Sequence, residues 1–134
     1  MTRHPREMYS DGSALEQLSR DESLQLMASA SVGRIIYTRR ALPAVGLVNF
    51  ALDHGDIVIR TASGGQLATA TQHSIVAFEV DCLDAAQQAG WTVTAIGPSR
   101  QVTEPEDIGW LQKMGLSSWA PGTRDQFIRI PRRF

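Results

Sequence analysis

The chain has 134 residues, of which 43% are hydrophobic and 20% charged, and its formal net charge is −1 at pH 7. These values predict one globular domain with its own core and argue against a nucleic-acid-binding protein, which would carry a clustered excess of basic residues. The single cysteine, Cys82, excludes an intramolecular disulfide and a cysteine metal cluster, and no segment is apolar enough for a secretory signal or a membrane span. We therefore expect a cytoplasmic protein with no membrane partner.

The first elements in chain order are a leader and a helix. Residues 1–12 are polar and have no periodicity, so we expect a flexible leader followed by a single domain over residues 13–134. Ser19 followed by Glu22 is a capping-box pattern, in which each side chain accepts a backbone N–H of the other residue. This pattern predicts a helix over Arg20–Ser29.

The centre of the chain is typical of β-structure. Runs rich in β-branched and aromatic residues are separated by short turns, and Asp53–Asp56 (DHGD) has the length and the glycine of a hairpin turn. The expected strands are Ser31–Thr38, Ala44–Leu52, Ile57–Ala62, Ser74–Asp81, Trp91–Val102 and Arg124–Ile130.

Three local patterns refine the later elements. Val76, Phe78 and Val80 alternate with polar residues and are expected to face the core, and Cys82 shares their parity, so it is expected to be buried as well. The Gly97-Pro98 pair is expected to bulge or bend its strand, because proline cannot donate a ladder hydrogen bond. Thr103 and Glu106 form a second capping-box pattern, which predicts a helix to Met114 that stops at Gly115.

These elements together predict an α+β fold that is mainly β. Six antiparallel strands with two clear helices, and a short helical segment from Gln66, favour a small barrel with short flanking helices over a doubly wound sheet. The chemistry that such a barrel would carry is not evident from catalytic motifs. His4, His54 and His73 lie far apart without metal-ligand spacing, and neither a nucleophile elbow nor a phosphate-binding Walker loop is present, so we assign no catalytic residue and no metal site.

One stretch could bind an anion. In VIRTASGGQLATAT (58–71) a strand ends at Arg60-Thr61, a Ser63-Gly64-Gly65 turn follows, and a helical segment starts at Gln66. The glycines allow close backbone approach, and a helix start leaves N–H groups unpaired. Taken alone, this signal for an anion site is weak, because strand–turn–helix junctions that contain glycine are common.

Several stretches resemble one known family when they are read in order. VGRIIYT (32–38), LPAVGLVNFAL (42–52), IVIRTASGGQLATA (57–70), GWTVTAIGPSRQV (90–102) and WAPGTRDQFIRI (119–130) are similar to the flavin-binding split-barrel proteins related to pyridoxamine 5′-phosphate oxidase, in their short nitroimidazole-resistance-like branch. The resemblance implies a six-stranded antiparallel split barrel that forms a homodimer, with two FMN clefts at the interface and a small-molecule substrate.

The resemblance also implies site residues. Leu47, Val48, Asn49 and Phe50 match the segment that lies along the isoalloxazine ring. The turn that takes the phosphate corresponds to Arg60, Thr61, Ser63, Gly65 and Gln66. Trp91 and Trp119 fall where aromatic residues shape the cleft or the interface, and a role in packing alone is at least as good an interpretation of both.

Two departures from the family narrow the function. Relatives often have Gly-Ser-Lys where this chain has Gly64, Gly65 and Gln66, so a cation is replaced by a neutral amide. The strand Ala44–Ala51 also lacks the basic residues of the vitamin B6 oxidases, which argues against that reaction. Three functions stay open: an FMN-dependent oxidoreductase, a barrel that binds a deazaflavin or haem, and a cofactor-free interaction module.

Overall fold

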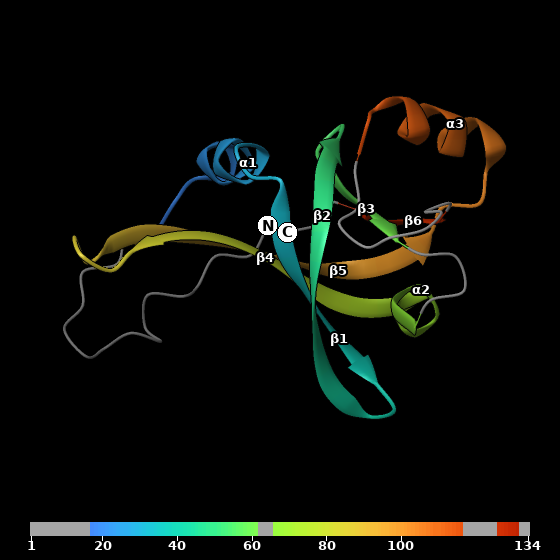
Figure 1. The fold of residues 1–134 in the computed structure, drawn as a ribbon, viewed down its shortest axis with the longest axis horizontal. Coiled ribbons are helices and arrows are strands. Elements are labelled where there is room, and N and C mark those ends of the chain that lie inside the picture. The colour runs from blue at the N-terminus through green and yellow to red at the C-terminus, as the bar shows by residue number, and fades with distance from the viewer. Residues whose placement is uncertain (1–16, 62–65, 117–125, 132–134) are drawn as a thin grey trace.

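The computed structural model describes residues 17–61, 66–116 and 126–131 (Figure 1). The elements in chain order are α1 (Arg20–Ala28), β1 (Val32–Arg39), β2 (Leu42–Asp53), β3 (Asp56–Thr61), α2 (Gln66–Thr71), β4 (Ser74–Asp84), β5 (Ala89–Gln101), α3 (Pro105–Lys113) and β6 (Gln126–Ile130). The expected leader, and the parts of the expected turn and last strand at residues 62–65 and 124–125, lie outside the described residues.

The six strands close into an antiparallel barrel. Their order is β1-β2-β3-β6-β5-β4, and β4 pairs with β1 to complete the ring. Closure removes most of the strand edges that would otherwise be free to pair with another chain. The predicted fold class, mainly β with short flanking helices, is therefore confirmed.

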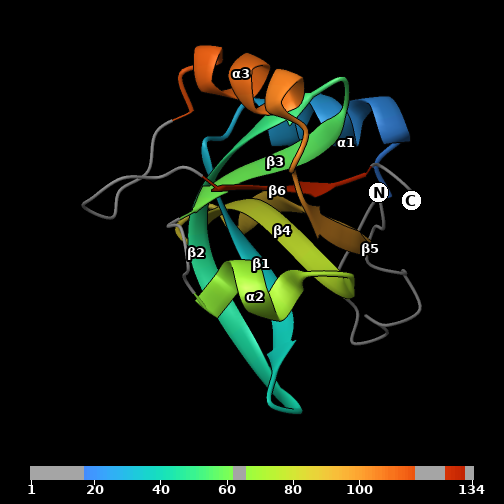
Figure 2. The same cartoon turned by 90° about the vertical axis from the view of Figure 1, so that its right-hand side faces the viewer.

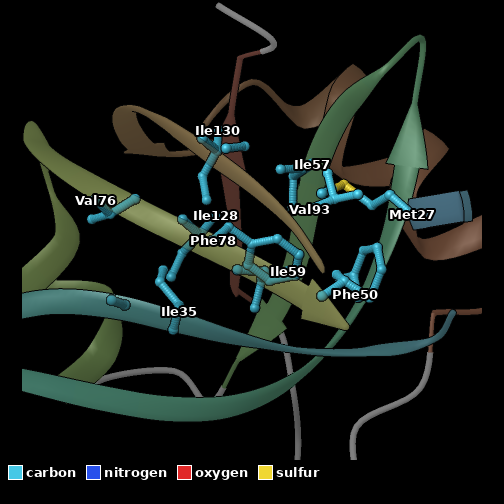
Figure 3. Packing of buried hydrophobic residues seen from close by; sticks show 13 residues of the cluster. Met27, Ile35, Phe50, Ile57, Ile59, Val76, Phe78, Val93, Ile128 and Ile130 are labelled. Atoms are coloured by element: carbon cyan, nitrogen blue, oxygen red, sulfur yellow. The ribbon is translucent and has the colours of Figure 1, made fainter. Parts of the chain in front are cut away.

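The barrel interior holds the main hydrophobic core. Phe78, Ile35 and Ile59 are fully buried there, and the rings of Phe50 and Phe78 meet edge to face with centroids 4.8 Å apart (Figure 3). A second core lies outside the barrel, where α3 covers β3 and β6 and buries Val58, Phe127 and Leu111 (Figure 2). One outer face of the barrel is thus covered by a helix.

Several local predictions agree with the structure. Ser19 and Glu22 form both hydrogen bonds of the capping box at the start of α1. Residues His54 and Gly55 make the β2–β3 hairpin turn, both with positive φ. Val76, Phe78 and Val80 are buried along β4, as their alternation indicated.

The prediction that Cys82 is buried is wrong. Cys82 is exposed, because β4 pairs with β1 only as far as Glu79 and then continues to Asp84 in a hairpin with β5 alone. Cys82 keeps the inward parity of Val80, but that part of the hairpin lies past the end of the core. Parity predicts burial only where a second layer covers the strand.

Two further expectations are corrected. At Gly97-Pro98 a bulge or a bend is expected, and no bulge occurs, since β5 stays in register with β4 from Ala89 to Ser99. Proline is accommodated because β6 pairs with β5 only at Arg100 and Gln101, which leaves Pro98 with a strand partner on one side. At α3 the N-cap is Glu104, without a side-chain cap bond, so Thr103 forms no capping box; Pro105 begins the helix instead.

Candidate functional site

The β2 segment Leu47–Phe50 runs along the point where β2 loses one of its neighbours. Leu47, Val48 and Asn49 pair with β1, whereas β3 pairs with β2 only from Phe50 to Asp53. The N–H of Phe50 donates to Ser31 O at 3.1 Å, on the β1 side. Because backbone groups alternate sides along a strand, Leu47 directs its N–H and C=O away from β1, where no described strand pairs with it.

The side chains of this segment alternate between the core and the outer surface. Phe50 and Val48 face the barrel interior, where Phe50 is 3% exposed and Val48 packs against the core. Leu47 is 63% exposed on the outer side, and Asn49, also directed outward, is buried at 8%. An exposed apolar side chain next to a buried amide and an open backbone edge suits a flat heteroaromatic ring with polar atoms along its rim.

Arg60 lies directly beyond the Phe50–Ile59 pair, at the end of β3. It has the same parity as Val58 and therefore points to the outer side, as Asn49 does, rather than into the barrel. Its guanidinium donates to Leu116 O at 3.0 Å and lies 5.7 Å from the centre of the Phe127 ring. These contacts hold a positive charge beside β2.

The end of β3 leads to α2, and the C-terminal end of α2 is hydrogen-bonded to the barrel. Thr61 ends β3, and α2 begins at Gln66. The buried Ser99 hydroxyl on β5 donates to Thr71 O, and the N–H of Gln101 donates to Gln72 Oε1 at 2.9 Å. The structure thus brings the Arg60-Thr61 strand end next to the Leu47–Phe50 segment, while Ser63 and Gly65 lie outside the described residues.

The two tryptophans of the expected site are not equally placed. Trp91 is half-buried on β5 and packs against the barrel core, opposite Cys82 of β4. Trp119 lies outside the described residues. Packing is the role that the described contacts of Trp91 support.

A charged cluster that the sequence did not indicate ties the β2–β3 turn to β6 and α3. Arg129 Nη2 donates to Asp53 at 2.7 Å and its Nη1 donates to Asp56 at 3.1 Å, while Trp110 Nε1 donates to the second oxygen of Asp53 at 3.1 Å. Burial raises the pKa of the Asp53 carboxyl, but these hydrogen bonds and the charge of Arg129 outweigh it and hold the pKa below its usual value. The cluster stabilises the side of the barrel that α3 covers.

The opposite outer face of the barrel has no such cover in the described structure. Four apolar residues stand in one row across neighbouring strands, each directly opposite the next: Val45 on β2, Ile36 on β1, Ala77 on β4 and Ile96 on β5. Val45 is 64% and Ile96 45% exposed. We call these four residues the apolar row; Leu47 borders it at the next outward position of β2.

Ion pairs lie along one side of the apolar row. Arg34 lies opposite Leu47 and contacts Asp81 at 3.2 Å and Glu79 at 3.7 Å. The apolar row is therefore an exposed apolar strip with charged residues on one side, and it adjoins the expected isoalloxazine segment at Leu47.

Neither a membrane-spanning helix nor a metal-binding group of side chains is found in the described part of the chain. No helix in residues 17–61, 66–116 and 126–131 is long and apolar enough to cross a bilayer. Across the same ranges, no three His, Cys, Asp or Glu residues gather as a metal-binding group.

Comparisons of sequence and structure show which known proteins this chain resembles. A protein from Mycobacterium tuberculosis (strain ATCC 25618 / H37Rv) of uncharacterised function is 34% identical over 119 residues, which cover 85% of this chain and 78% of that one. The FAD binding protein from Mycobacterium smegmatis is 28% identical, with a TM-score of 0.74 over 88% of this chain and 92% of that one. The FAD and haem binding protein from the same organism is 13% identical and shares the fold alone, with a TM-score of 0.68 over 87% and 68% of the two chains. The model of the pyridoxamine 5′-phosphate oxidase family matches residues 19–133, and the chain belongs to that family.

Proposed function

We propose that the chain is a homodimeric flavin-binding oxidoreductase that holds FMN beside β2 and transfers hydride or electrons to a small molecule. One observation carries the proposal: the open backbone edge of β2 at Leu47 lies next to the positively charged strand end at Arg60. The resemblance to an FAD binding protein over nearly the whole chain supports a flavin. The choice of FMN rests on the resemblance of the β2 and β3 sequences to the FMN-binding split-barrel family.

The residues present fit such a cofactor. The outward N–H and C=O of Leu47 suit the donor and acceptor atoms along the ring's polar rim. The side-chain amide of Asn49 is a second polar group on the same side of the strand. Arg60, Thr61 and the start of α2 lie toward the phosphate end. A bound flavin would supply the hydride- or electron-transfer chemistry, so no acid or base from these residues is required for it. The residues of this chain would bind and orient the flavin and exclude water from it.

The dimer is the second part of the proposal. The apolar row borders Leu47, so a second copy seated on it would cover one side of the ring segment and exclude water from the cleft. Stable dimers bury on the order of 800 Å² on each partner, which a four-strand face can supply. α3 already covers the other outer face, so it leaves the apolar row as the surface for the partner.

The visible absorption spectrum of the purified protein tests this function. We expect flavin bands, release of the flavin on denaturation, and an increase of melting temperature when FMN is added to the apoprotein. Parallel titrations with FAD, a deazaflavin and haem rank the cofactors. Tightest binding of deazaflavin or haem would reject FMN, and a colourless dimer that no cofactor stabilises would favour an interaction module.

Arg60 is expected to contribute to binding through the phosphate. Replacing it with alanine should weaken FMN binding by about tenfold, the usual worth of one charge-assisted contact, while riboflavin, which lacks the phosphate, binds nearly unchanged. The FMN-to-riboflavin affinity ratio separates this effect from damage to the fold, because Arg60 also holds Leu116 O. Arg100→Ala, an exposed arginine of β5, is the matched control. Equal losses for both ligands would assign Arg60 a purely structural role.

A gain of affinity is expected from Gln66→Lys. The family resemblance implies a lysine at this position, and an ammonium at the start of α2 should tighten FMN binding by about tenfold without changing riboflavin binding. Isothermal titration of both ligands measures the difference. If this variant binds neither ligand, the result would argue against a phosphate site at this turn and would support a cofactor-free module.

A further inference from the structure

Two hairpins extend beyond the part of the barrel in which their strands have neighbours on both sides. β1 pairs with β4 only over Arg34–Ile36, yet β1 and β2 continue to pair as far as Arg39 and Leu42. β4 and β5 likewise continue beyond Glu79 as far as Asp84 and Ala89. Figure 1 shows both hairpins projecting from the body of the molecule, the β1–β2 turn at the bottom and the β4–β5 turn at the left.

The two projections lie at opposite ends of the same sheet. β1 and β4 are antiparallel neighbours, so the turn that follows β1 and the turn that follows β4 lie toward opposite ends of the strands from the Ile36–Ala77 pair. The twist of the sheet turns one hairpin to the bottom and the other to the left of Figure 1. The Ile36–Ala77 pair is the centre of the apolar row, which therefore lies between the two projections.

The projections carry opposite charges and exposed leucines. The basic arm, as we name residues 39–42, has an exposed Arg40 at its turn and Leu42 at 67% exposure. The acidic arm, residues 81–84, has Asp81, an exposed Asp84 and Leu83 at 73% exposure. Within the described chain neither Arg40 nor Asp84 has an ion-pair partner, and Asp84 instead accepts the N–H of Gln87 at 3.1 Å.

The two-residue turn of the basic arm has a defined geometry. Arg40 and Ala41 both have positive φ, 53° and 63°, which non-glycine residues adopt only with strain. The rigid two-residue turn fixes where Arg40 projects. Leu42 and Leu83, exposed on the two arms, are apolar surface that an isolated chain would leave in water.

We propose that, in the homodimer, the basic arm of each protomer contacts the acidic arm of its partner; this inference rests on the proposed dimer. Consider a two-fold axis that lies between the two facing sheets and runs along the apolar row, perpendicular to the strands. This axis places the basic-arm end of one sheet over the acidic-arm end of the other, so unlike arms meet twice per dimer. Arg40 is four residues beyond Ile36, about 13 Å along the strand, and the acidic arm runs from Asp81, about 13 Å beyond Ala77, to Asp84, about 23 Å beyond it. The guanidinium thus reaches the level at which the carboxylates of the acidic arm begin.

Charge reversal and its rescue test this contact. We expect Arg40→Glu and Asp84→Arg each to raise the dimer dissociation constant on the order of tenfold, because each change acts at both symmetric contacts, and the double variant to restore it. Sedimentation equilibrium of the full chain at low and high salt measures the constants, and the effect should shrink at high salt. Asp84→Asn retains the hydrogen bond to Gln87 and should give a smaller increase. Lys113→Glu, on the α3 side, is the control.

The outcomes separate this inference from the dimer itself. A wild-type chain that stays monomeric overturns both proposals. A stable dimer that neither reversal weakens leaves the dimer in place and rejects the arm contact. If the single variants weaken the dimer but the double variant is no tighter than either, the arms act on other surfaces and do not meet.

Discussion

Replacing Asp53 with alanine is expected to lower the free energy of unfolding by about 3 kcal/mol, because it leaves a nearly buried guanidinium without its shortest partner. Arg129 donates to Asp53 at 2.7 Å, and the side chains of these two residues are 12% and 8% exposed. The substitution also removes the acceptor of the Trp110 N–H. Urea unfolding at neutral pH and fixed protein concentration measures the loss.

Asp56→Ala is the matched control for this prediction. Asp56 accepts a hydrogen bond from the other terminal nitrogen of Arg129 at 3.1 Å. The Asp56 side chain is 27% exposed, so water can replace the lost carboxylate more easily. We expect a loss of about 1 kcal/mol, in the range of partly exposed ion pairs. Equal losses for the two variants would mean that burial does not set the strength of this cluster.

Acidification should reduce the contribution of Asp53. Its folded-state pKa lies below the ordinary value, so the ionised form stabilises the fold at pH values above about 4 and this stabilisation is lost as the pH falls through the folded pKa. The melting temperature of wild type should therefore fall more than that of Asp53→Asn below pH 4. Parallel curves would assign the acid sensitivity to other carboxylates.

Short-range sequence patterns correctly predicted several local elements of the fold. The capping box of Ser19 and Glu22 acts within one helical turn, and the alternation of Val76, Phe78 and Val80 reflects the geometry of a single strand. Each of these signals depends on near neighbours, so the sequence alone contains them. The extent of β4 could not be read in the same way, because the exposure of Cys82 depends on where β1 stops pairing.

The site was only partly predictable, for the same reason. The adjacency of Leu47–Phe50 and Arg60 follows from a predicted hairpin and is local. Arg60, however, contacts Leu116 and Phe127, which are distant in the sequence. Asp53 accepts hydrogen bonds from Trp110 and Arg129, which lie 57 and 76 residues away from it. No short-range pattern encodes such pairs, because only closure of the barrel and docking of α3 bring them together.

Phe78→Ala is the substitution from which we expect the largest effect. Its ring is fully buried in the barrel and meets that of Phe50, so truncation creates a cavity that the strands cannot close. The expected loss is about 3–5 kcal/mol, most of the stability of an ordinary small domain. Because Phe50 belongs to the proposed flavin segment, flavin affinity should fall with stability. Urea unfolding and flavin titration check the two effects.

Gly33 provides an internal test of this packing argument. A Cβ at Gly33 would lie 2.4 Å from Phe78 Cζ, so the absence of a side chain there makes room for the ring. Gly33→Ala should therefore cost about 1–3 kcal/mol in the wild type, as overpacking does. In the Phe78→Ala background the same methyl group should cost at least about 1 kcal/mol less, since only the 3.1 Å approach to Glu79 O remains. Additive costs would show that the ring and the glycine do not share this space, and that the strain at Gly33 arises from the β4 backbone.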